Sequence, residues 1–149
     1  MYNFWQFLHV TFAIAWVGGS ILMIFLAMRF SKFGDNPVAG PATGLVAATS
    51  VPLFMVASLG TLATGLVLAF GWIGFQPLWI KLGLGGIAIS LVMGFGYHKP
   101  HGAKLEQAVK ERGPQDPGVQ AMMRQSTMVG IVETLILIGV VWAMVAKPV

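Results

Sequence analysis

"FWQFLHVTFAIAWVGGSILMIFLAMRF", residues 4–30, is an apolar run with few polar side chains in it. The hydrocarbon core of a bilayer is about 30 Å thick, and a helix needs roughly 20 apolar residues to cross it. The run is long enough for this, lacks a basic segment before it and ends in Arg29, so it predicts a retained membrane helix rather than a cleaved signal peptide. The imidazole of His9 lies inside the run and requires an explanation.

Three further segments meet the same length requirement, at residues 51–72, 78–97 and 128–146. The chain of 149 residues is 56% hydrophobic and only 9% charged, which lies outside the usual range for soluble domains. Backbone groups in hydrocarbon must be hydrogen-bonded within the protein, and these uninterrupted runs do not alternate as barrel strands do. We therefore expect a single all-α domain over residues 1–149, an integral membrane four-helix bundle in contact with the lipid bilayer.

The basic residues are distributed unevenly between the predicted connections. The "GWIGFQP" connection, residues 71–77, carries no charge, whereas the other two connections carry Arg29, Lys32, Lys99, Lys104, Lys110, Arg112 and Arg124. Cytoplasmic loops of membrane proteins are enriched in Lys and Arg. Both charged connections are therefore predicted to be cytoplasmic and both termini outside, in a multi-pass protein of a bacterial-type inner membrane. Because the basic residues flank helices and form no basic domain, nucleic acid is excluded as a partner.

The two charged connections differ in their expected structure. The first, "SKFGDNPVAGPATG" (residues 31–44), is rich in Gly and Pro and predicts an irregular connection, in which Pro41 could start the second span early. The second contains Glu106 and Lys110, a favourable i,i+4 pair, followed by Gly113 and Pro114. This pattern predicts a short surface helix at about residues 101–112.

Ionisable side chains within the spans are few, and each is a functional hypothesis because a charge in lipid is costly. At a rise of about 1.5 Å per residue, His9 and Lys81 both lie near the outer ends of their spans and can share an outer site. Glu133 enters from the cytoplasmic side and forms a predicted inner polar cluster with His98 and Arg29. The chain has no cysteine, so thiolate metal sites are excluded.

Two of these residues each have two interpretations. His9, Ala13, Trp16 and Ser20 fall on nearly one helical face. A histidine and a tryptophan with small residues between them suit the edge and plane of a porphyrin. They also suit a histidine hydrogen-bonded to a threonine or a carbonyl on the next helix. Lys81 either extends its ammonium to the membrane interface or loses its proton and binds a metal.

Glu133 also has two interpretations. It forms an ion pair with Arg29 or Arg124 that holds the bundle together, or it contacts a substrate or relays protons. A stripe of small residues, Gly86, Ser90 and Gly94, either packs against another helix or accommodates a flat ligand. The nine methionines are either apolar packing residues or ligands for Cu(I).

Three short motifs resemble a known superfamily. They are "LHV" (residues 8–10), "WVGG" (residues 16–19) and "WIKLGL" (residues 79–84). Together they resemble the small four-helix membrane proteins that include the HemJ-type protoporphyrinogen oxidases, the CopD-like copper-resistance domains and relatives of unknown function. In the HemJ type, a histidine and a lysine associated with haem b match His9 and Lys81. The Pro-Arg pair of that type is absent here, where the next arginine after Trp16 is Arg29.

The resemblance implies a haem-b-binding, redox-active membrane protein that takes part in electron transfer. His9 and Lys81 are then the expected metal ligands, and Trp16 is expected beside the cofactor. Whether the chain is an oxidoreductase such as a protoporphyrinogen oxidase is left open. There are two alternatives: a CopD-like copper-handling protein, and a non-catalytic accessory subunit that packs against other membrane subunits or forms a homo-oligomer.

Overall fold

The computed structural model describes the backbone of residues 1–30 and 39–148, and the side chains of residues 1–29, 50 and 52–148. Its elements are α1 (Tyr2–Phe30), α2 (Ala39–Leu68), the π-helical segment η1 (Ala69–Ile73), α3 (Leu78–Met93), the π-helical segment η2 (Gly94–His98), α4 (Lys99–Arg112) and α5 (Pro117–Ala146). The predicted irregular connection begins on residues 31–38, which lie outside the described residues and include Lys32. Its second half is helical, because α2 begins at Ala39 and places Pro41 in the first turn.

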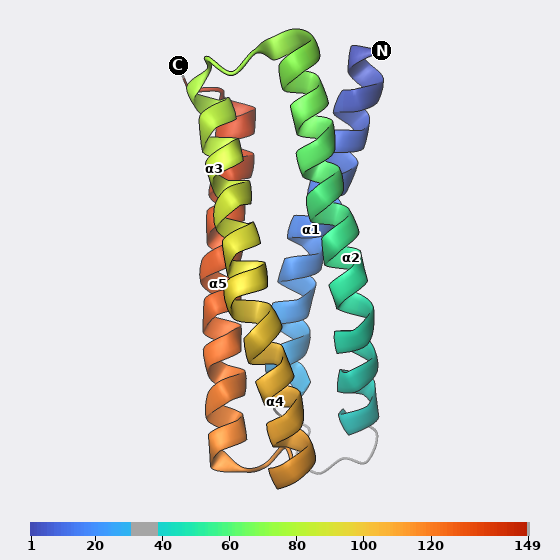
Figure 1. Cartoon of the computed structure of the whole chain (residues 1–149), viewed down its shortest axis with the longest axis vertical. Helices are drawn as coiled ribbons and strands as arrows, with labels where there is room; N and C mark the ends of the chain where they lie inside the picture. The colour runs from blue at the N-terminus through green and yellow to red at the C-terminus, as the bar shows by residue number, and fades with distance from the viewer. Residues whose placement is uncertain (31–38, 149) are drawn as a thin grey trace.

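The helices form a bundle of four rods (Figure 1). Segment η1 continues α2, and η2 joins α3 to α4 without a break, so residues 78–112 form one rod. Four helices of the described chain are long and apolar enough to cross a membrane: Tyr2–Arg29, Pro52–Ile73, Leu78–Arg112 and Pro117–Ala146. The prediction of an all-α chain with four such helices is therefore confirmed.

Both chain ends lie at the same end of the bundle, which we call the terminal end (Figure 1). The opposite end, where residues 113–116 connect α4 to α5, is called the loop end. Which side of a membrane each end faces stays a prediction. Lys81 lies on α3 at the terminal end. Glu133 lies on α5, between the two ends of the bundle.

The helix boundaries at the loop end differ from the predicted ones. The region expected to form a separate surface helix at residues 101–112 is instead the last part of the rod that starts at Leu78. This rod ends where Gly113 adopts a φ of 82°, which favours glycine. Helix α5 begins at Pro117 rather than at residue 128, because the Asp116 side chain accepts a hydrogen bond from the backbone N–H of Val119 at 3.0 Å.

One residue from each rod meets in the centre of the bundle. Trp16 of α1, Ala57 of α2, Ile87 of α3 and Leu137 of α5 form the buried apolar cluster. Helix α1 packs along α2 and also against α5, and α3 packs against α5. Large apolar side chains are exposed on the outside, including Phe70 at 77%. Such an apolar exterior is compatible with contact with the lipid bilayer.

Small residues let the helices approach closely at two interfaces. A Cβ atom at Gly60 of α2 would lie 2.7 Å from the Phe12 ring of α1. On α3, a Cβ atom at Gly86 would collide with Val140 of α5. Gly86 of the predicted small-residue stripe therefore packs against a helix. Ser90 of the same stripe is buried, whereas a Cβ at Gly94 would have nothing within 4 Å.

Candidate functional site

His9 is directed at helix α2. Its Nδ1 lies 3.0 Å from the carbonyl oxygen of Thr61 and 3.2 Å from the hydroxyl oxygen of Thr64. Both threonines are buried, so the imidazole faces the interior of the bundle. The space for the ring comes from Gly65, where a Cβ atom would lie 3.0 Å from His9 Cε1. These hydrogen bonds thus connect α1 to α2 at the terminal end.

The partners of Nδ1 define the tautomer of the neutral imidazole. A carbonyl oxygen can only accept a hydrogen bond, and the Thr64 hydroxyl donates its own hydrogen to the Gly60 carbonyl at 2.6 Å. Nδ1 of His9 therefore has to be the donor. The remaining nitrogen, Nε2, then has a free lone pair, and within the described part of the chain it has no hydrogen-bond partner.

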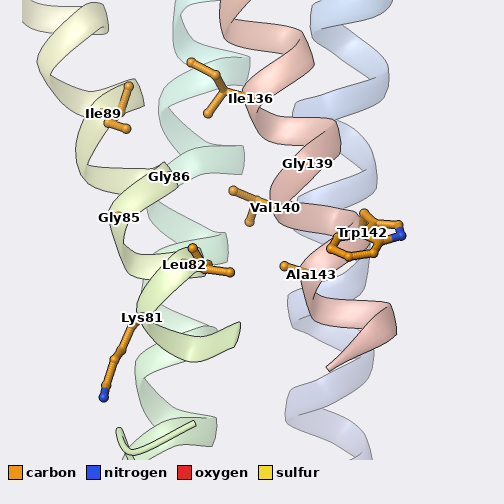
Figure 2. Close-up of a pocket in the computed structure, with 10 residues that line it drawn as sticks. All are labelled: Lys81, Leu82, Gly85, Gly86, Ile89, Ile136, Gly139, Val140, Trp142 and Ala143. Carbon is orange, nitrogen blue, oxygen red and sulfur yellow. The ribbon is translucent and has the colours of Figure 1, made fainter. Parts of the chain in front are cut away.

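Trp16 and Lys81, the other two predicted cofactor residues, lie elsewhere. Trp16 fills the centre of the bundle, with 6% of its surface exposed, and touches residues of the other three rods. Lys81 is exposed on the outside of α3, and its side chain extends toward the start of that helix (Figure 2). Helices α1 and α3 share no extended interface in the described chain, so the structure does not bring His9 and Lys81 together.

An apolar groove of about 370 Å³ runs between α3 and α5 on the outside of the bundle (Figure 2). Lys81 lies at its end nearest the start of α3. The α3 side of the groove consists of Lys81, Leu82, Gly85, Gly86 and Ile89. The α5 side consists of Ile136, Gly139, Val140, Trp142 and Ala143. The groove is open where Gly85 and Gly139 lack side chains, because a Cβ at either position would have no heavy atom within 4 Å.

Of the predicted inner polar cluster, the structure pairs Glu133 with His98 rather than with an arginine. Nε2 of His98 lies 2.7 Å from Oε2 of Glu133, with side-chain exposures of 34% and 15%. Arg29 instead lies over the Phe25 ring of its own helix, 5.2 Å from the ring centre. Arg124 borders a cavity of about 430 Å³ between α1, α4 and α5. The carboxylate is paired with a histidine because the unbroken α3–η2–α4 rod carries His98 alongside α5.

Tyr97, which the sequence analysis did not single out, lies beside His98 of this pair. The Tyr97 ring stacks on His101 at 4.9 Å and meets His98 edge-on at 5.4 Å. Nε2 of His101 lies 3.2 Å from the Met122 carbonyl oxygen. The Tyr97 hydroxyl is buried without a hydrogen-bond partner in the described structure. The sequence analysis allowed for a hydrogen bond from His9 to a neighbouring helix, and the structure contains it, with Thr61 and Thr64 of α2 as the partners.

Within the described residues, no group of three or more histidine or carboxylate side chains is placed to hold a metal ion. Haem iron differs from such a site, because it takes one or two axial ligands from the protein. Among the described residues, His9 and His101 each have one ring nitrogen at a backbone carbonyl oxygen and the other nitrogen without a hydrogen-bond partner. Searches against protein-family models, curated proteins and solved structures found no match to this chain.

Proposed function

We propose that this chain is a redox-active, multi-pass membrane protein that binds haem b through Nε2 of His9. Haem b supplies one-electron oxidation and reduction when bound. His9 would hold the haem through Nε2, and the identity of the protein ligand is one of the properties that govern the reduction potential of a haem. The proposal rests on the geometry of His9 and on the resemblance of its motifs to the HemJ-type proteins.

The hydrogen bond from Nδ1 of His9 to the Thr61 carbonyl carries the argument. Metal-binding histidines almost always donate their second ring N–H to a carbonyl, a carboxylate or water, which orients the ring and raises the basicity of the ligating nitrogen. At 3.0 Å the His9–Thr61 bond has this form. The other nitrogen, Nε2, has no hydrogen-bond partner in the described chain, so it is the atom of His9 that would bind the iron.

The role of Lys81 is narrower in this proposal than in the sequence analysis. Its side chain lies at the end of the groove on the outside of α3, and His9 faces α2 on the inside. We therefore assign the axial position to His9 and treat the Lys81 ammonium as outside the haem site. We further propose the orientation that the loop charges predict, with the terminal end outside a bacterial-type inner membrane.

The test is an absorption spectrum of detergent-purified protein expressed with ample haem, before and after reduction with dithionite. We expect a Soret band that His9→Ala abolishes. His101→Ala is the matched control, because it removes an imidazole at the loop end, and it should leave the band unchanged. Lys81→Gln should also leave it unchanged. Absence of a Soret band from the wild-type protein overturns the proposal.

The same preparation separates the two alternative functions. A copper-handling protein would show no Soret band and would contain copper by elemental analysis. An accessory subunit would contain neither cofactor and would co-purify with other membrane proteins. Size-exclusion profiles of each variant establish that a lost band reflects lost haem rather than lost fold.

A further inference from the structure

We infer that the groove between α3 and α5 is a binding site for one anionic phospholipid, with its phosphate at Lys81 and an acyl chain along the groove. This inference does not depend on the proposed haem site, because His9 contacts α2 and the groove is formed by α3 and α5. It rests on the shape of the groove, on the charge at its end and on the arrangement that a second protein copy would produce there.

The groove is long and narrow, as a single acyl chain of a lipid requires. From Lys81 to Ile89 it follows α3 for eight residues, or about 12 Å at the rise of a helix. Its floor is widened at Gly85 and Gly139, where side chains are missing from both helices. Val140 points across the groove toward α3 (Figure 2) and closes it on the inner side against Gly86. A narrow apolar channel that opens to lipid thus runs along the bundle.

Lys81, at the terminal end of the groove, is not paired with any carboxylate of the described residues. Lys147 lies over the Trp79 ring at 5.7 Å. No aspartate or glutamate occurs in residues 36–105 or after residue 133, so the segments that form this end contain no carboxylate side chain. A phosphate at the membrane interface would complement the Lys81 ammonium, because basic residues near a membrane surface attract anionic lipids.

The Lys81 charge also argues against a second copy of the chain as the occupant. A two-fold symmetric contact, with both copies oriented alike in the membrane, would bring the same patch of each copy together. Lys81 of one copy would then lie close to Lys81 of the other, and like charges that meet at an interface are repulsive. A lipid avoids this repulsion, and it leaves Trp142, 66% exposed, in contact with acyl chains.

The experiment is native mass spectrometry of the detergent-solubilised full chain, titrated with phosphatidylglycerol or phosphatidylcholine of equal chain length. We expect one phosphatidylglycerol per protein, retained about fivefold better than phosphatidylcholine, as one lysine near an anionic surface provides. Lys81→Gln should remove this preference, whereas Lys104→Gln, at the loop end, should keep it. Gly139→Leu should lower the retention of both lipids, because it fills the groove where space is open.

Gly18→Leu is the control for Gly139→Leu, since its Cβ position on α1 is also free of contacts. Gly85→Leu provides a second groove-filling variant if Gly139→Leu does not fold. Equal retention of the two lipids by the wild-type protein overturns the inference. So does unchanged lipid retention in both groove-filling variants. A Gly139→Leu protein with half the mass of the wild-type assembly would show that a second copy occupies the groove, which also overturns it.

Discussion

The contact between His98 and Glu133 allows a quantitative prediction. Charge-assisted hydrogen bonds contribute about 1.5–3 kcal/mol, whereas solvent-exposed ion pairs contribute about 0–1 kcal/mol. The 2.7 Å distance between His98 Nε2 and Glu133 Oε2 is typical of a charge-assisted hydrogen bond. The two side chains are 34% and 15% exposed, which lowers the expected contribution toward that of a solvent-exposed pair. We therefore expect a coupling free energy of about 1–2 kcal/mol between the two side chains.

A double-mutant cycle measures this coupling. The free energy of unfolding is determined by SDS titration in mixed micelles for the wild-type protein, His98→Ala, Glu133→Ala and the double variant. The cycle cancels the packing free energy that each truncation removes by itself, so the difference that remains is the interaction free energy between the two side chains. Arg29→Ala combined with Glu133→Ala is the matched control, because the Arg29 guanidinium lies over Phe25. Its coupling to Glu133 should be within about 0.5 kcal/mol of zero.

Two results would refute this reasoning. A coupling between His98 and Glu133 below about 0.5 kcal/mol would mean that water replaces the contact at no cost. A larger coupling of Glu133 to Arg29 would restore the ion pair expected from the sequence. Glu133→Gln adds information about function, because a haem protein that keeps its stability and loses turnover in this variant would have a proton relay at this carboxylate.

Three further predictions concern topology and stability. A reporter active only in the cytoplasm should work when fused after Lys104 and fail when fused after Val149, and the reverse pattern would invert the proposed orientation. Gly60→Ala should destabilise the protein by about 1–3 kcal/mol, because the new methyl group collides with a ring on α1, whereas Gly18→Ala should leave stability unchanged or raise it by up to about 1 kcal/mol; SDS titration compares the two. Asp116→Ala should cost about 0.5–2 kcal/mol in the same assay through loss of the α5 cap, and an unaltered unfolding curve would contradict that role.

The sequence predicts the membrane-spanning part of this fold well, because the thickness of the bilayer sets the number of apolar residues that a spanning helix needs. It predicts the helix ends less well, because a helix can extend beyond its apolar run into polar residues. The polar residues 117–127 illustrate this: they belong to α5, although their hydropathy placed them in a loop. The cap at Asp116 and the proline after it were the local signals of that start.

The candidate site shows a second property that the sequence does not predict, the rotation of each helix about its own axis. Depth along a span follows from residue number, and it correctly places Glu133 and His98 at one level. Helices that are apolar all round give no signal for which face points inward. Lys81 therefore has the depth expected for a partner of His9 and faces the outside of α3. The hydrogen bond that satisfies His9 comes from α2, which no spacing along the chain reveals.

The unbroken rod of α3, η2 and α4 is longer than a single bilayer crossing requires. Its 35 residues correspond to about 52 Å, well beyond a hydrocarbon core of about 30 Å. Membrane helices adapt to bilayer thickness by tilting. If this rod pivots as one body about its terminal end, a tilt of about 10° moves its far end sideways by about 9 Å. Bilayer thickness would thus be converted into the position of α4 outside the lipid.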